Sequence, residues 1–452
     1  MKKLHTFVIT CAAVIVTLLT GCTAQEMPDK TNSRAETSPS TFVSLEEATN
    51  DLLGLVKDLE DNRTRATSGQ RRIGDSYVMT SGRSTRSDSV QPRIYIINFE
   101  NNQGYAIMSA DNRMPSLLAF VESGHITPGD TLKEPGLVVF LGNMEEYYKK
   151  KPKIDLDKYI KDDGTSEMLV KPNGYYWTYG PWENIVYKQN GYCPVKWGQD
   201  SIYYNAYCPK SNKTKSGHKA AGCVPVSVAQ LMACHKYPPE CNGYTYDWTE
   251  MTRFPKAKNI QPVYQDQVAR LIQQLGKDDN LDVNYGDEES GAKAKHSIRT
   301  LRHFRYSNPG VMNNYNTDSV VSEIKSGHPV LCSGYSDKKD YKIFGWTVWS
   351  QLKSGHAWLI HGMLERKRIC YLNLENEGVI STSIETEYYP LCNWGWEGRH
   401  DGYFLSGVFD AAGLPEYTDF GTDLSIPSDN NGDGEHDHYY QYGIKTITKI
   451  RK

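Results

Sequence analysis

The sequence has no apolar run that indicates a membrane-spanning helix, and it has no large excess of charge of either sign. The apolar run near the N-terminus, from Phe7 to Leu18, falls short of the ~20 residues that cross a bilayer. The 51 basic and 54 acidic residues leave a formal net charge of −3. Nothing in this balance calls for nucleic acid or an anionic membrane surface as a partner.

Paired C-x-x-C spacings are also missing, so the cysteines do not indicate structural zinc. After Cys11 and Cys22, eight cysteines remain, too widely spread for a small disulfide framework: Cys193, Cys208, Cys223, Cys234, Cys241, Cys332, Cys370 and Cys392. Their connectivity stays open. If one of the eight is a free nucleophile, at least one more has no intramolecular partner.

No metal or cofactor is expected. The segment Asp429–Glu435 begins like a calcium loop, but its twelfth position is Tyr440 instead of the closing Glu, which favours a solvated loop.

A chain of 452 residues is too long for one ordinary domain, and two or three are expected. Hydrophobic residues make up 38% of it, which excludes a wholly disordered chain.

The N-terminus has the charged start and short apolar middle of an export signal. The run ends at Leu19-Thr20-Gly21-Cys22, which resembles the bacterial lipobox, so we expect Cys22 to be lipidated and to begin the mature protein. A plain secretory signal is the alternative, and it would leave Cys22 without a special role. The polar stretch Glu26–Ser40 reads as a tether. The expected location is the cell envelope or surface, with the lipid as the only membrane contact.

The region after the tether has the pattern of a small α+β domain. Ser44 and Glu47 form a capping box at the start of a helix. The β-rich runs at residues 94–99 and 104–108 predict a hairpin. The Arg-rich stretch Arg63–Arg93 is interpreted as an exposed, protease-accessible loop. We place a domain boundary near Val170, which gives a signal at 1–22, a tether and prodomain at 23–170, and a second domain at 171–452.

Cys223 is the first candidate for chemistry in the second domain. The apolar spacing from Val224 to His235 predicts a helix, and Pro225 is tolerated only in its first turn. Cys223 then lies at the helix N-terminus, where free N–H groups and the dipole stabilise a thiolate. Gly222 before it allows close approach of the backbone. A buried, inert cysteine is the alternative.

His356 is the expected imidazole partner of this thiol. Gly355 precedes it, and the following residues have the pattern of a strand that His356 begins. A thiolate–imidazolium pair activates the sulfur and supplies the acid for a leaving amine. His361 is a rival within the same strand, and His235 on the helix is more typical of a core residue.

Two amides complete the candidate site. The imidazole needs a group that fixes its tautomer, and Asn393 lies beside Trp394, an indole that excludes water. An oxyanion donor is also required, and Gln199 lies upstream of the cysteine. Taken singly, each amide is more typical of an ordinary surface residue.

The order Gln, Cys, His, Asn resembles that of papain-like cysteine proteases, and the local segments resemble the streptopain family of secreted bacterial cysteine proteases. The segments are KWGQDSIYYNAYCP (196–209), GCVPVSVAQLMACHKYP (222–238), SGHAWLIHGM (354–363) and NWGWEGRHDGYF (393–404). In that order they carry the family's oxyanion Gln, nucleophile, base, and Asn-Trp support. A fifth segment, GYAIMSADNR (104–113), resembles part of its propeptide.

The resemblance implies an α+β, papain-like fold whose helical part carries the cysteine and whose antiparallel β part carries the histidine. It also implies a zymogen with an inhibitory prodomain and protein or peptide substrates. Two other classes remain open: an inactive surface binding module of the same fold, and a Cys–His acyltransferase or deamidase.

Three features depart from the family pattern. His361 stands where an acidic residue is usual, Val224-Pro225 replaces smaller residues, and the segment between Met363 and Leu391 is long enough to carry an insertion.

Overall fold

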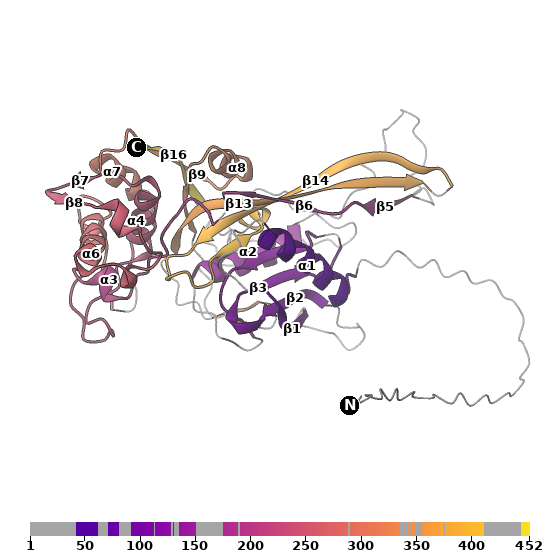
Figure 1. The fold of residues 1–452 in the computed structure, drawn as a ribbon, viewed down its shortest axis with the longest axis horizontal. Coiled ribbons are helices and arrows are strands. Elements are labelled where there is room, and N and C mark those ends of the chain that lie inside the picture. Colours follow the sequence, from indigo (N-terminus) through magenta and orange to yellow (C-terminus); the bar gives the residue numbers. More distant parts are fainter. Residues whose placement is uncertain are drawn as a thin grey trace, which may run out of the picture. The chain divides into compact units, whose positions relative to one another are not determined.

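The computed structural model describes residues 42–61, 71–80, 92–112, 114–127, 130, 135–150, 175–188, 190–287, 290–334, 341–343, 346–348, 355–374, 376–410 and 444–452 (Figure 1). They belong to one compact unit, Thr41–Lys452. The signal sequence, Cys22, the tether, the boundary near Val170 and the Asp429–Glu435 loop lie outside the described residues.

The N-terminal region forms an antiparallel meander with two helices. Its elements are α1 (Leu45–Asp61), β1 (Ile73–Thr80), β2 (Pro92–Phe99), the 3₁₀ turn η1 (Glu100–Asn102), β3 (Tyr105–Ser109), β4 (Leu117–Val121) and α2 (Pro135–Lys150). The predicted capping box is confirmed, because Glu47 N–H donates to Ser44 Oγ and Ser44 N–H donates to Glu47 Oε2. The predicted hairpin is confirmed as β2 and β3.

The expectation of an exposed loop over the whole stretch Arg63–Arg93 was wrong in its middle. Strand β1 pairs antiparallel with β2 there, because Ile73, Tyr77 and Met79 recur with the period of two that lets a strand bury one face. Arg71, just before the strand, is buried and donates from Nε to the carbonyl of Gln103 at 3.0 Å. A protease therefore cannot reach Arg71 in the folded protein, although the stretch as a whole was expected to be accessible.

The second region has a helical part and a β part. The helical part contains α3 (Ile202–Asn205), α4 (Cys223–His235), β7 (Glu240–Cys241), β8 (Tyr244–Thr245), α5 (Trp248–Met251), η3 (Ala257–Asn259), α6 (Pro262–Gly276) and α7 (His296–His303). The β part contains β5 (Tyr175–Tyr179), β6 (Glu183–Tyr187), β9 (Asn308–Asn314), α8 (Thr317–Lys325), β10 (Val330–Gly334), β11 (Tyr341–Ile343), β12 (Trp346–Val348), β13 (His356–Leu374), β14 (Gly378–Asn393), β15 (Gly402–Phe404), α9 (Ser406–Phe409) and β16 (Lys445–Arg451). The predicted α+β class is confirmed.

One antiparallel sheet runs through both regions in the order β1-β2-β3-β4-β15-β14-β13-β10-β16-β9. The junction is the pairing of β4 with β15, in which Phe120 lies opposite Tyr403. One hydrophobic core follows the sheet across this junction and contains residues of α2 together with Trp358, Trp394 and Phe404. A second core surrounds α4 and α6. The two regions are thus joined by backbone hydrogen bonds and by buried apolar area.

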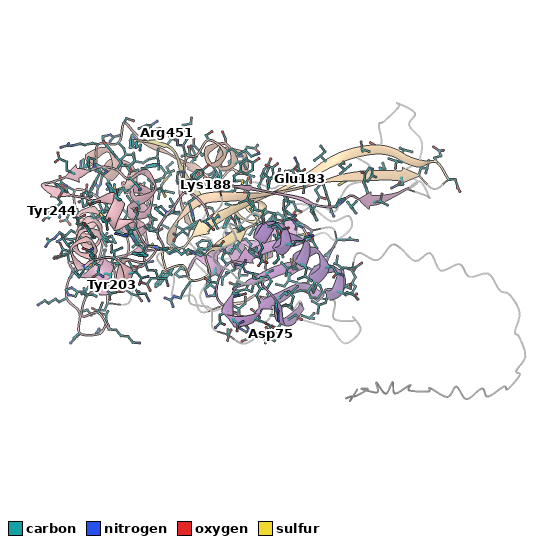
Figure 2. All side chains as sticks on the ribbon, viewed as in Figure 1. Asp75, Glu183, Lys188, Tyr203, Tyr244 and Arg451 are labelled. Atoms are coloured by element: carbon teal, nitrogen blue, oxygen red, sulfur yellow. The ribbon has the colours of Figure 1, made fainter. Side chains whose placement is uncertain are left out.

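The long segment between Met363 and Leu391 is a β-hairpin. Strands β13 and β14 pair from Leu359 and Asn393 out to Leu374 and Gly378, and β6 and β5 pair in succession along the other edge of β13 (Figure 1). Glu183 lies on β6 (Figure 2). It forms an ion pair with Lys367 of the hairpin at 3.2 Å. Among the residues that the structure describes, no helix is both long and apolar enough to cross a membrane.

Candidate active site

Cys223 is the first residue of α4, as the sequence predicts. The preceding Gly222 has φ +91°, and a Cβ at that position would lie 2.9 Å from the carbonyl oxygen of Ser290, so a side chain there would be strained and crowded. The Cys223 side chain is half-buried, while the helix behind it is buried from Val224 to Ala233. The thiol is therefore held at a helix N-terminus on a rigid support and keeps access to solvent.

Gln230, two turns along α4, ties the helix to two other parts of the site. Its Nε2 donates to the carbonyl of Trp197 at 3.2 Å and to Asn393 Oδ1 at 2.9 Å. Sequence analysis missed this residue. A completely buried amide in an otherwise apolar helix is the signal that could have identified it, because such a group needs hydrogen-bond partners.

His356 begins β13, as predicted, and lies opposite Gly334 of β10. The ring stacks on Trp358 with an interplanar angle of 14° and is 4% exposed. Its Nε2 lies 2.9 Å from the carbonyl oxygen of Trp394. A carbonyl can only accept a hydrogen bond, so Nε2 carries the proton and Nδ1 of the neutral ring is left as the acceptor. This tautomer is the one that can take a proton at Nδ1.

The imidazole of His356 is expected to be neutral at pH 7 in the full chain. Burial lowers the pKa of the imidazole to about 4, and the hydrogen bond to the Trp394 carbonyl only partly offsets this. A thiolate–imidazolium pair needs the charged ring, so burial of His356 in the full chain favours the neutral thiol and neutral imidazole over that pair.

The rival His361 has a different environment. It is buried in the middle of β13, and its Nδ1 accepts the backbone N–H of Cys193 at 3.2 Å. Burial lowers its pKa to about 3. A ring nitrogen already used as a structural acceptor is a poor general base.

Gln199 lies in the chain segment before α3, and its side chain is 5% exposed. Its backbone carbonyl accepts the N–H of Ala221 at 2.8 Å, which fixes it beside the chain that leads into Cys223. The side-chain Nε2 is buried and has no hydrogen-bond partner among the described residues. A buried donor without a partner lowers the stability of the folded protein by about 1–3 kcal/mol. Such a loss is expected for a donor that is kept available to bind an oxyanion.

Asn393 does not occupy the place that sequence analysis assigned to it. Its Oδ1 accepts from Gln230 and from the backbone N–H of Gly395, and its Nδ2 donates to the carbonyl of Val195 at 2.9 Å. The contact to His356 is made by the next residue, through the Trp394 carbonyl. Asn393 thus joins β14 to α4 and to the segment that leads to Gln199.

Trp394 is held on three sides. Its backbone N–H donates to Asp401 Oδ1 at 3.0 Å, its Nε1 donates to the carbonyl of His400 at 2.9 Å, and its ring packs on Trp358 and Phe404. Burial raises the pKa of Asp401 to about 7. Asp401 was also missed by sequence analysis, because it acts through a backbone peptide and not on the imidazole directly.

The candidate nucleophile and the candidate base come from different elements that pack together. Helix α4 contacts β13, and one small cavity is lined by Val224 and Ala357, the residues that directly follow Cys223 and His356. The helix that begins with Cys223 and the strand that begins with His356 are therefore in contact.

The chain is similar to known proteins in both of its regions. Residues 197–404 match the model of the Peptidase C10 family, and residues 32–148 match that of the Spi protease inhibitor. Streptopain of Streptococcus pyogenes serotype M1 is 23% identical over 360 residues, which cover 71% of this chain and 75% of streptopain.

Two solved structures are also similar. A prointerpain A fragment of Prevotella intermedia is 21% identical, with a TM-score of 0.44 and coverage of 73% of this chain and 91% of the fragment. Active interpain A of the same organism is 24% identical, with a TM-score of 0.33 and coverage of 47% and 84%.

The C10 match includes Gln199, Cys223, His356 and Asn393, and streptopain is similar over most of the chain. The resemblance inferred from the sequence is confirmed: residues 197–404 match the Peptidase C10 family, and the protein is a cysteine-type peptidase.

Proposed function

We propose that the protein is an endopeptidase made as a latent, exported zymogen and that Cys223 and His356 are its catalytic pair. The observation that carries this proposal is the placement of a half-exposed thiol at the N-terminus of α4, on a helix that packs against the strand begun by His356. The tautomer of His356 supports it, because Nδ1 is the nitrogen left to accept a proton.

The proposed reaction is acyl transfer. The thiol of Cys223 gives its proton to His356 Nδ1, and the thiolate attacks the peptide carbonyl. The oxyanion receives hydrogen bonds from Gln199 Nε2 and the Cys223 backbone N–H. The imidazolium then protonates the leaving amine, and water hydrolyses the acyl-enzyme. Asn393 and Gln230 hold α4, the strand end and the Gln199 segment in register.

A casein assay on processed enzyme, with and without a thiol-alkylating inhibitor, tests this function. We expect new peptide termini in the untreated sample and none after alkylation. An acyltransferase or deamidase would alter side chains without new termini. Processed, folded protein that leaves casein intact would support the inactive binding module instead.

Replacement of Gln199 by Ala should lower kcat by about 10²–10³-fold, because one oxyanion donor is lost while the nucleophile and base remain. KM should change little. Steady-state kinetics on preprocessed enzyme measure this. Gln273→Ala is a matched control, since this glutamine lies on α6 and not at the site. A Gln199→Ala enzyme with unchanged kcat would remove Gln199 from the proposed mechanism.

Latency is proposed to come from residues 23–170, with residues 171–452 as the peptidase domain. The shared sheet through β4 and β15 and the shared core support this, as does the Spi inhibitor match. Helix α2 comes especially close: a Cβ on Gly136 would lie 2.0 Å from the Trp394 ring. The prodomain thus packs on the residue whose carbonyl holds His356.

Replacement of Gly136 by Ala should weaken this docking, so that the full chain processes itself faster and its Cys223 reacts faster with a small thiol reagent. Gly54→Ala on α1 is the control, because a Cβ there meets nothing within 4 Å. Circular dichroism and a single thermal transition establish that each variant is folded. A folded Gly136→Ala chain that is as latent as the unmodified chain would contradict the proposed role of α2.

The lipid anchor at Cys22 is proposed from the lipobox alone. Cleavage between α2 and β5 would cut the covalent link between the peptidase domain and the anchor. The shared sheet and core would still hold the two parts together by non-covalent contacts. Metabolic labelling with a radioactive fatty acid, in the unmodified chain and in Cys22→Ser, tests the anchor.

A further inference from the structure

Cys193 and Cys234 form a close pair of thiols that the proposed mechanism does not use. Cys193 Sγ lies 3.8 Å from the carbonyl oxygen of Gln230 and 3.3 Å from that of Val195. The Gln230 carbonyl is the one that accepts the N–H of Cys234 one helical turn later. Interaction with the Cys193 side chain is also one of the causes that raise the pKa of the Cys234 thiol, in keeping with this proximity. Both are free thiols in the structure.

Four of the other described thiols, those of Cys241, Cys332, Cys370 and Cys392, have different surroundings. Cys332 lies on β10 and Cys392 on β14, and these strands flank β13 on opposite sides. Two strand spacings separate them by about 9–10 Å, which exceeds the ~7 Å limit between Cα atoms for a disulfide. The Cys370 thiol donates to Glu385, and the Cys241 thiol donates to the carbonyl of His303.

We propose that Cys193 and Cys234 are joined by a disulfide bond when the chain folds in an oxidising compartment. The oxidising compartment follows from the proposed export of the protein. The choice of these two cysteines is inferred from the geometry of their thiols. A disulfide of a small thiol or of an oxidoreductase is the oxidant. Its S–S bond breaks, the Cys193–Cys234 S–S bond forms through a mixed disulfide, and two thiols of the oxidant are released with the two protons.

The bond would act on the active site by fixing its scaffold. Cys193 begins the segment that runs through Val195 and Trp197 to Gln199, and Cys234 lies on the helix that begins with Cys223. Hydrogen bonds from Asn393 and Gln230 already hold this segment. The covalent link adds a constraint on the unfolded chain by closing the loop between residues 193 and 234.

Burial raises the pKa of the Cys234 thiol well above its usual range. The Cys193 thiol is itself buried, and the Cys234 thiol is half-buried. Since the thiolate is the species that exchanges with disulfides, oxidation of the folded, reduced protein should be slow. The bond should form quickly only during folding, before α4 is buried.

The test uses the full chain with Cys223→Ala, refolded with oxidised and reduced glutathione. Remaining thiols are alkylated after denaturation, and the protein is digested without reduction. We expect mass spectrometry to find the peptide of Cys193 linked to that of Cys234. We also expect the Tm to fall by about 5 °C when a reductant is added.

Cys193→Ser, Cys234→Ser and the double variant should each lose the reductant-dependent fall in Tm, whereas Cys241→Ser should keep it. The comparison is between oxidised and reduced samples of the same protein, so destabilisation by a substitution itself cancels. Alkylation of both Cys193 and Cys234 at every glutathione ratio would overturn the proposal. A crosslink that joins either residue to a different cysteine would also overturn it.

Discussion

Replacement of Cys223 by Ala should abolish peptide hydrolysis and self-processing while leaving the fold intact. The substitution removes the sulfur that forms the acyl-enzyme, and loss of a nucleophile from a catalytic pair costs on the order of 10⁴-fold or more in kcat. The residue is half-exposed at the helix start, so the smaller side chain should disturb packing little. The measurements are casein turnover and the size of the purified chain.

Cys208→Ser is the control for this substitution, because Cys208 is a buried cysteine of the same helical part. It should retain turnover and processing. Residual hydrolysis by Cys223→Ala within tenfold of the unmodified enzyme would show that another group is the nucleophile.

Replacement of His356 by Ala should be nearly as severe, since the thiol and imidazole act as a unit and removal of either disables both. Replacement of His361 by Ala should leave most of kcat, because the His361 ring serves as a structural acceptor for the backbone N–H of Cys193. The kinetics are measured on enzyme processed before the assay, so that effects on maturation do not enter.

Thermal unfolding of the His361→Ala variant separates a loss of stability from a loss of chemistry. An inactive but folded His361→Ala enzyme, together with an active His356→Ala enzyme, would reverse the assignment of the base.

The positions of Cys223 and His356 could be predicted from the sequence because each depends on local signals. Pro225 restricts where the helix begins, and Gly355 marks the entry to the strand. Both elements begin where those signals indicate, and the α+β class follows from the same patterns. The capping box at Ser44 is local in the same sense.

The group that holds His356 could not be predicted in the same way. It is the backbone carbonyl of Trp394, and a carbonyl is present in every residue, so it leaves no mark in the sequence. Sequence reasoning therefore favoured the adjacent amide of Asn393. Asp401 and Gln230 also act across long sequence separations, through the Trp394 peptide and through Asn393.

Strand β1 was missed because the residues on both sides of it in the sequence are of types that are common in loops. The Arg, Ser and Gly residues on both sides indicate a loop, whereas the strand depends on pairing with β2. An edge strand with one half-buried face carries a weak local signal. The long β13–β14 hairpin shows the opposite case, since its length was visible in the sequence and only its conformation was not.

The most direct test of the central claim is the site at which one equivalent of a peptide-based electrophile reacts with the processed enzyme. We expect a single covalent adduct on Cys223, with loss of casein hydrolysis in proportion to labelling. We also expect the His356→Ala enzyme to be labelled far more slowly. Full labelling of Cys223 with hydrolysis unchanged, or an inactivating adduct on another residue, would contradict it.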